Sequence, residues 1–137
     1  MRLLILALVL AAASAVIAAD NNAPPLSPAQ RRIDAAKTVL QKQPDRFHAH
    51  NDLALGLISR ARETGDSSYY EEAEKSIARS LQIQPQNFDG EQAHIALLLA
   101  EGRNAEALAE AKALNHKTPD AVLVWGYISE ADEALGD

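Results

Sequence analysis

Prolines that interrupt a helical pattern are the feature of this chain that most constrains its fold. Residues 69–85, YYEEAEKSIARSLQIQP, carry apolar side chains at helical spacing and end at Pro85. A proline disfavours the helical conformation in the residue before it, so helices tend to end there. Pro44 and Pro119 close similar segments. The pattern predicts a series of short helices separated by proline turns.

The composition agrees with an all-α fold, since alanine and leucine are abundant and only 4% of the 137 residues are aromatic. We expect one helical domain at 28–137 behind a polar linker at 20–27. Ser27 and Pro28 fit the N-cap and first position of the first helix, and Ser67 or Ser68 could cap the third. Six helices are predicted, at about 28–43, 46–63, 67–84, 87–101, 104–116 and 120–135.

Landmarks that recur at fixed distances indicate an internal repeat. Ala73 and Ala107 precede Pro85 and Pro119, respectively, by the same distance along the chain. Gly102 and Gly136 likewise follow these two prolines by the same distance. The interval from Pro85 to Pro119 matches the helix-turn-helix period of about 34 residues that is typical of one class of helical repeat proteins.

The interval from Pro44 to Pro85 is longer than the interval from Pro85 to Pro119 by seven positions. Gly65 follows Pro44 at a distance four positions greater than that of Gly102 from Pro85, an excess of about one helical turn. The turn between Gly65 and Ala73 holds the other three extra positions. The sequence therefore predicts a lengthened second helix and an enlarged turn after it.

These residues resemble the tetratricopeptide repeat family over about residues 29–137. Residues that match the first half of its motif are Trp125, Ile128, Ser129, Leu135, Gly136 and Asp137; those that match the second half are Tyr70, Glu71, Glu72, Ala73, Leu81 and Pro85. The fourth helix departs, with Glu91 and His94 in the places of Trp125 and Ile128. The resemblance implies antiparallel helix-turn-helix hairpins stacked as a short right-handed α-solenoid, and a scaffold that binds protein or peptide.

The resemblance also implies a peptide groove lined by the first helix of each hairpin. The fourth, seventh, eleventh, fourteenth and fifteenth positions after Pro44 and after Pro85 give its candidates: His48, Asn51, Leu55, Ile58, Ser59, Asp89, Gln92, Ala96, Leu99 and Ala100. The Lys and Asn clamp with which some members hold a C-terminal carboxylate is absent. We expect a neutral, moderately apolar groove that suits an extended or helical peptide better than an acidic tail.

The sixth helix is the most apolar segment after residue 27, and its pattern lacks a partner helix. Its candidate interface residues at the exposed end are Val122, Val124, Trp125 and Ile128. Two interpretations remain: a truncated form of a longer array, or an end that packs on another molecule, foremost a second copy in a homodimer. The alternative function is accordingly a self-associating or truncated array fragment that serves as a subunit of a larger envelope assembly, secretion or cofactor-maturation machine.

Residues 1–19 have the pattern of a secretory signal peptide, with Arg2, an apolar stretch and small residues before a cleavage site after Ala18 or Ala19. The alternative is a membrane anchor. The chain has no cysteine, hence neither a lipidation site of the lipobox type nor disulfides. We expect a periplasmic or secreted bacterial protein without stable membrane insertion after cleavage.

Charge and motifs limit the other functions. Cleavage would leave 12 basic and 19 acidic residues, a net charge of −7, which disfavours nucleic acid and anionic lipid as partners. No phosphate-binding loop, G-x-S-x-G or cysteine nucleophile is present, so we expect no enzyme and no cofactor. His48 and His50 point about 200° apart on a helix and would not share a metal ion.

Overall fold

The computed structural model describes residues 25–136, and this part of the chain is all-α, as predicted. Its helices differ from the predicted ranges by at most two positions at either end. They are α1 (Pro28–Lys42), α2 (Phe47–Thr64), α3 (Ser68–Ile83), α4 (Phe88–Ala100), α5 (Asn104–Lys117) and α6 (Val122–Leu135).

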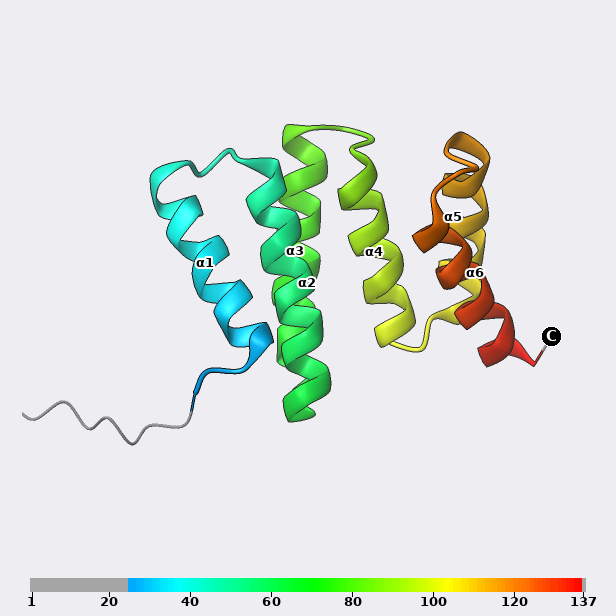
Figure 1. The fold of residues 1–137 in the computed structure, drawn as a ribbon, viewed down its shortest axis with the longest axis horizontal. Coiled ribbons are helices and arrows are strands. Elements are labelled where there is room, and N and C mark those ends of the chain that lie inside the picture. The colour runs from blue at the N-terminus through cyan, green and yellow to red at the C-terminus, as the bar shows by residue number, and fades with distance from the viewer. Residues whose placement is uncertain (1–24, 137) are drawn as a thin grey trace, which may run out of the picture.

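Consecutive helices run antiparallel and pack against each other in a row from α1 to α6 (Figure 1). α2 packs on α1, α3 and α4, and α4 packs on α3, α5 and α6. The even-numbered helices α2, α4 and α6 therefore lie beside one another and form one layer, on the side that faces the viewer in Figure 1. This layer carries the candidate site described below.

Two apolar clusters hold the row together, and α4 contributes to both. Leu97 of α4 joins the cluster built on α2 and α3, and Leu98 joins the cluster built on α5 and α6. Burying a leucine side chain of this kind stabilises the fold by about 1.5–3 kcal/mol. Ala73 and Ala107, the alanines of the repeat, are 0% exposed. Their small side chains allow the two helices of a pair to approach closely.

Glu91 and His94, the polar residues of α4 that take the places of Trp125 and Ile128, are paired with α5. Glu91 Oε1 accepts a hydrogen bond from Lys117 Nζ at 2.8 Å, and His94 Nδ1 lies 2.7 Å from Glu110 Oε2. Both pairs lie near the surface, where water solvates the groups that the pairing leaves free. α4 thus keeps its place beside α5 although Glu91 and His94 depart from the apolar pattern.

Local chemistry explains where the helices begin and end. Ser27 caps α1 as predicted, since its Oγ accepts a hydrogen bond from Gln30 N at 3.1 Å. Ser67 occupies the N-cap position of α3, one of the two predicted, but its side chain makes no capping hydrogen bond, and Asp66 Oδ1 accepts from Ser68 N at 3.0 Å instead. A carboxylate two residues before an amide competes well for it in such turns.

The lengthened second helix is present, since α2 has 18 residues against 13 in α4. Gly65 ends α2 in the left-handed conformation, with φ of 74°, which glycine adopts without steric cost. None of the helices within residues 25–136 combines the length and the apolar character needed to cross a membrane.

Candidate peptide-binding groove

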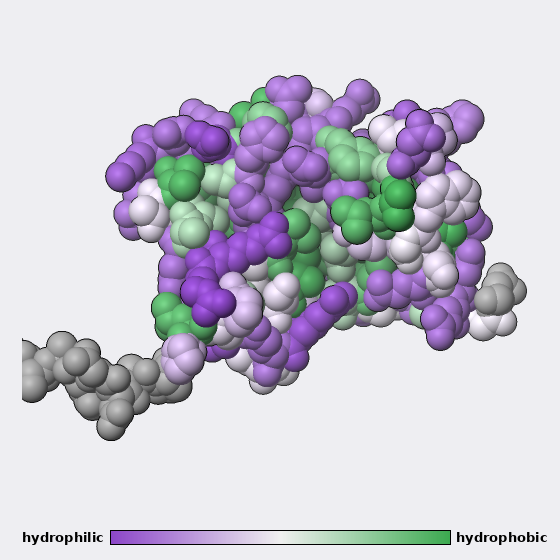
Figure 2. Space-filling model, in the orientation of Figure 1, coloured by the Kyte–Doolittle hydropathy of each residue, from purple (hydrophilic) through white to green (hydrophobic). Residues whose placement is uncertain are grey.

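A groove of about 450 Å³ runs across the layer formed by α2, α4 and α6. Figure 2 shows this face, with hydrophobic residues gathered over the region of α4 and α6 and hydrophilic residues around them. Three helices of one layer thus contribute to a single recess. The residues that line it are Arg32, His48, Asn51, Asp52, Leu55, Asp89, Gln92, Leu123 and Tyr127.

Helical spacing places these side chains on one face of each helix. Asn51 and Leu55 are four positions apart on α2, and Asp89 and Gln92 are three apart on α4, so each pair projects to the same side. The layered packing of α2 on α4 and of α4 on α6 then brings the faces together. The groove consequently has an apolar component from leucines and a polar component from amides and carboxylates.

Charges in the groove are nearly balanced. Arg32 Nη2 lies 2.8 Å from Asp52 Oδ1, and His48 Nδ1 lies 3.5 Å from Asp89 Oδ2. Both pairs are exposed, so water screens them and each contributes little to stability. At the α6 end of the groove, burial raises the pKa of Tyr127 above its ordinary value of 10.0, with a further increase from Glu130 and an opposing effect of Arg62.

Two amide side chains in the groove have atoms without a hydrogen-bond partner among the described residues. Asn51 donates from Nδ2 to Asn87 Oδ1 at 2.9 Å, while its buried Oδ1 accepts no hydrogen bond. The buried Nε2 of Gln92 donates none. A buried polar atom left unpaired costs about 1–3 kcal/mol, so each of these two amides reduces the stability of the fold at this place.

The structure brings half of the predicted groove residues into the groove: His48, Asn51, Leu55, Asp89 and Gln92. Ser59 is exposed outside it, with its Oγ donating to Leu55 O at 2.9 Å. Ala96 and Ala100 pack partly buried against the cluster of α2 and α3.

The prediction is wrong for Ile58 and Leu99, which are 3% and 9% exposed and belong to the two core clusters. The groove candidates follow from counting residues after each proline, which gives positions at constant spacing along one helix. This count carries no information on where a neighbouring helix covers the same face. Ile58 packs in the cluster that α2 forms with α3 and α4, and Leu99 packs where α5 and α6 lie on α4.

Four groove residues escaped the sequence prediction: Arg32, Asp52, Leu123 and Tyr127. Leu123 had a signal, because it is the fourth residue after Pro119, as His48 and Asp89 are after their prolines. Arg32 reaches the groove from α1, and nothing in the repeat pattern indicates that contribution.

At the end of the row, α6 exposes a different set of side chains from the one predicted. Val122 and Trp125 are exposed, at 81% and 54%, but Val124 and Ile128 are buried, at 0% and 9%. Those two predictions are wrong because both side chains face inward and pack in the cluster with α5. The indole Nε1 of Trp125 donates to Pro119 O at 3.1 Å.

The two neighbouring histidines have separate environments. His48 lies in the groove, whereas His50 Nε2 contacts Pro44 O at 2.8 Å. Within residues 25–136 no group of three potential ligands among His, Asp and Glu is placed to hold a metal ion.

Comparisons of the chain with protein-family models, with curated proteins and with solved structures found no match.

Proposed function

We propose that this protein is a non-enzymatic scaffold of the tetratricopeptide repeat type that binds a segment of another protein in the groove of α2, α4 and α6. The observation that carries the proposal is the convergence of three helices of one layer on one recess that is lined by both leucine and polar side chains. The repeat landmarks Pro44, Pro85 and Pro119 support the same interpretation.

The chemistry of the groove favours a peptide backbone over a charged group. Gln92 is partly exposed in the groove, and its side-chain amide offers hydrogen-bonding groups to a peptide backbone. Leu55 and Leu123 offer apolar contact for one or two side chains of the ligand. Asp52 and Asp89 leave no excess of positive charge, so an acidic tail is disfavoured.

A peptide selection tests the proposal. We expect the purified protein to enrich a family of sequences from a phage library of random peptides. Leu123→Glu should weaken binding of the selected peptides at least tenfold, because it places a carboxylate in the apolar end of the groove. Fluorescence anisotropy with the labelled peptides measures the affinity.

Val122→Glu is the matched control, since it adds the same charge at the adjacent, more exposed residue outside the groove. It should leave the affinity within about twofold, as expected for an exposed site. Failure to enrich any peptide, or equal loss in both variants, would contradict the proposed function. Circular dichroism confirms that each variant is folded.

We further propose that the scaffold works in the bacterial periplasm or outside the cell. Residues 1–19 lie outside the described part of the chain, so this proposal rests on their sequence pattern. Mass spectrometry of the protein from a periplasmic fraction should show a chain that begins at Ala19 or Asp20. An uncleaved chain in the membrane fraction would instead support the anchor alternative.

A further inference from the structure

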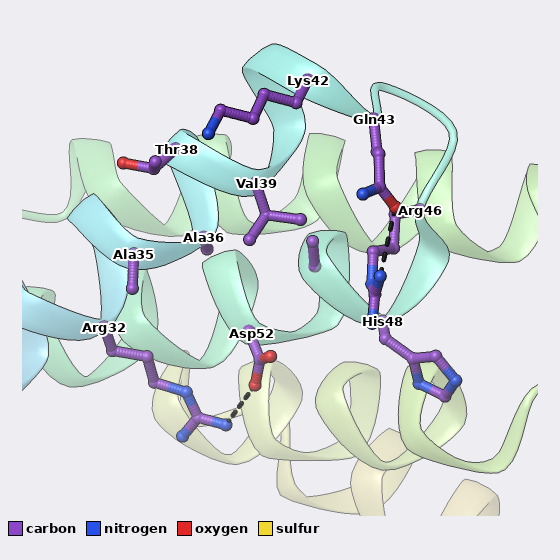
Figure 3. Close-up of a pocket in the computed structure, with 11 residues that line it drawn as sticks. Arg32, Ala35, Ala36, Thr38, Val39, Lys42, Gln43, Arg46, His48 and Asp52 are labelled. Carbon is purple, nitrogen blue, oxygen red and sulfur yellow. Dashed lines mark hydrogen bonds and ion pairs between the residues drawn. The ribbon is translucent and has the colours of Figure 1, made fainter.

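A second hollow, of about 480 Å³, lies between α1 and α2, and we call it the α1–α2 slot (Figure 3). Its apolar lining comes from Ala35, Ala36, Val39 and Ala49, and its other residues are Arg32, Thr38, Lys42, Gln43, Arg46, His48 and Asp52. The slot thus has three cationic side chains, those of Arg32, Lys42 and Arg46. Its one carboxylate, Asp52, is already paired with Arg32. This is a local excess of positive charge on a chain whose formal net charge is −6.

The repeat identifies what occupies the corresponding position elsewhere in the row. One repeat after Ala36, Arg46 and Asp52, counted from Pro44 to Pro85, come Ile77, Asn87 and Ala93. All three are buried, and α2 is what covers them: Ile77 and Ala93 share a cluster with its Leu57, and Asn87 accepts a hydrogen bond from its Asn51. The α1–α2 slot is therefore the position of a helix like α2, and no helix within residues 25–136 fills it.

α6 has the same place within its repeat as α2 and α4 have within theirs. One of its faces is not covered by another helix of residues 25–136. Ser129, Asp132 and Glu133 lie one repeat after Ile95, Leu98 and Leu99, through which α4 packs on α5. They also lie two repeats after Ala54, Leu57 and Ile58, through which α2 packs on α3. In α6 this face is exposed at Ser129 and Glu133 and partly exposed at Asp132.

Size and charge on α6 are complementary to those of the slot. Arg32 occupies the position of Ala73 and Ala107, so α1 has a large cation where the other hairpins have a buried alanine. Opposite that position α6 has the small Ser129 where α4 has Ile95, and the acidic Asp132 where α4 has Leu98. In the other hairpins a small alanine faces a large apolar residue, and in the docked pair the large Arg32 would face the small Ser129. Arg32 would also gain the anionic neighbour Asp132.

We propose that α6 of one copy of this protein docks into the α1–α2 slot of a second copy, head to tail. Arg32 then faces Asp132 of the other copy, and Trp125 of the other copy covers the apolar lining of the slot. The association places an α6 beside α2 in the same layer, which prolongs the groove from one copy into the next. It does not depend on which peptide the groove binds.

Charge disfavours the symmetric alternative, in which two α6 helices pack on each other. α6 carries Glu130, Asp132 and Glu133 and no basic residue, so a symmetric contact would bring like charges together. Within residues 25–136 the one ion pair of Asp132 is long, 3.9 Å to Lys112 Nζ. The head-to-tail contact is heterologous, and it forms dimers and then longer oligomers as concentration rises.

Cysteine cross-linking distinguishes the arrangements, because the chain has no cysteine of its own. Ala35→Cys places a thiol in the slot, and Ser129→Cys places one on the uncovered face of α6. With a short bismaleimide, a mixture of the two variants should yield a cross-linked dimer, and neither variant alone should do so efficiently. A dimer from Ser129→Cys alone would establish the symmetric contact and overturn the proposal.

A charge exchange tests the contact between Arg32 and Asp132. Arg32→Glu and Asp132→Arg should each weaken self-association about tenfold or more in sedimentation velocity over a concentration series. An equimolar mixture of the two should recover most of the association. Lys37→Glu is the matched control, an equal change of charge on an exposed α1 residue outside the slot, and should associate like the wild type.

Two further outcomes would overturn the proposal. One is a monomer at every concentration tested. The other is a monomer in which Ala35→Cys is protected from maleimide, since another segment or a bound protein would then fill the slot. Arg32 lines both the groove and the slot, whereas Asp132 lines neither, so Asp132→Arg separates loss of self-association from loss of peptide binding.

Discussion

At the scale of single residues, Asn87 connects more of the structure than any residue singled out from the sequence. Its Oδ1 accepts from Gly90 N at 2.7 Å, which caps α4, and from Asn51 Nδ2 of α2. Its Nδ2 donates to Gln84 O at 2.8 Å and to Ser80 Oγ of α3 at 3.2 Å. One buried amide therefore fixes the start of α4 relative to both α2 and α3.

This arrangement predicts opposite effects for the same substitution at two helical glycines. A Cβ on Gly90 would lie 2.7 Å from Asn87 Oδ1, whereas a Cβ on Gly126 would meet nothing within 4 Å. We expect Gly126→Ala to stabilise the protein by about 0.5–1 kcal/mol through helix propensity. Gly90→Ala should destabilise it by about 1–3 kcal/mol, because Asn87 must move and lose hydrogen bonds. Urea denaturation measures both.

Asn87→Ala provides the control for this mechanism. In that background the clash is absent, so Gly90→Ala should become neutral or stabilising, and the two effects should not be additive. An equal penalty for Gly90→Ala with and without Asn87 would show that the amide is not its cause.

At the scale of elements, the starts and ends of helices depend on exposed carboxylates with defined partners. Arg103 precedes α5 and donates to Glu106 through Nε at 2.9 Å and Nη2 at 2.7 Å, which lowers the pKa of Glu106 below its ordinary 4.5. The hydroxyl of Ser27, and then Arg60, lower the pKa of Glu63. Ser68 lowers the pKa of Asp66 from 3.8.

These shifts predict the direction of the pH dependence. A carboxyl group with a lower pKa in the folded state favours folding above its unfolded pKa, and the contribution is lost as the pH falls through the folded value. Stability should therefore decrease on acidification below about pH 4.5. We expect Glu106→Gln to reduce the slope of the free energy of unfolding between about pH 5 and pH 2.5, measured by urea denaturation.

The matched control is Glu74→Gln on α3. Glu74 is exposed and makes no ion pair with any residue of the described range, so the substitution removes no interaction. An equal reduction of the slope in both variants would indicate a general effect of net charge and contradict the role assigned to Arg103 and Glu106.

At the scale of the whole molecule, α4 links the two apolar clusters and each end of the row is polar at core-like positions. Arg32 at one end and Asp132 at the other replace residues that are apolar in the interior of the row. These polar replacements favour solubility of the ends and, since their charges are opposite, selective contact between them. The cross-linking and charge-exchange experiments distinguish the two consequences.

Local sequence determined the helices of this protein, since prolines, helical apolar spacing and the glycine at the end of α2 act within a few residues. It also determined the length of α2 and the positions of Ala73 and Ala107, at which the two helices of a pair approach closely. Only the tertiary structure decided which faces are covered. Ile58, Leu99, Val124 and Ile128 are buried by neighbouring helices that are distant in sequence. The groove and the α1–α2 slot form where helices from different pairs meet, so spacing along one helix predicts them only in part.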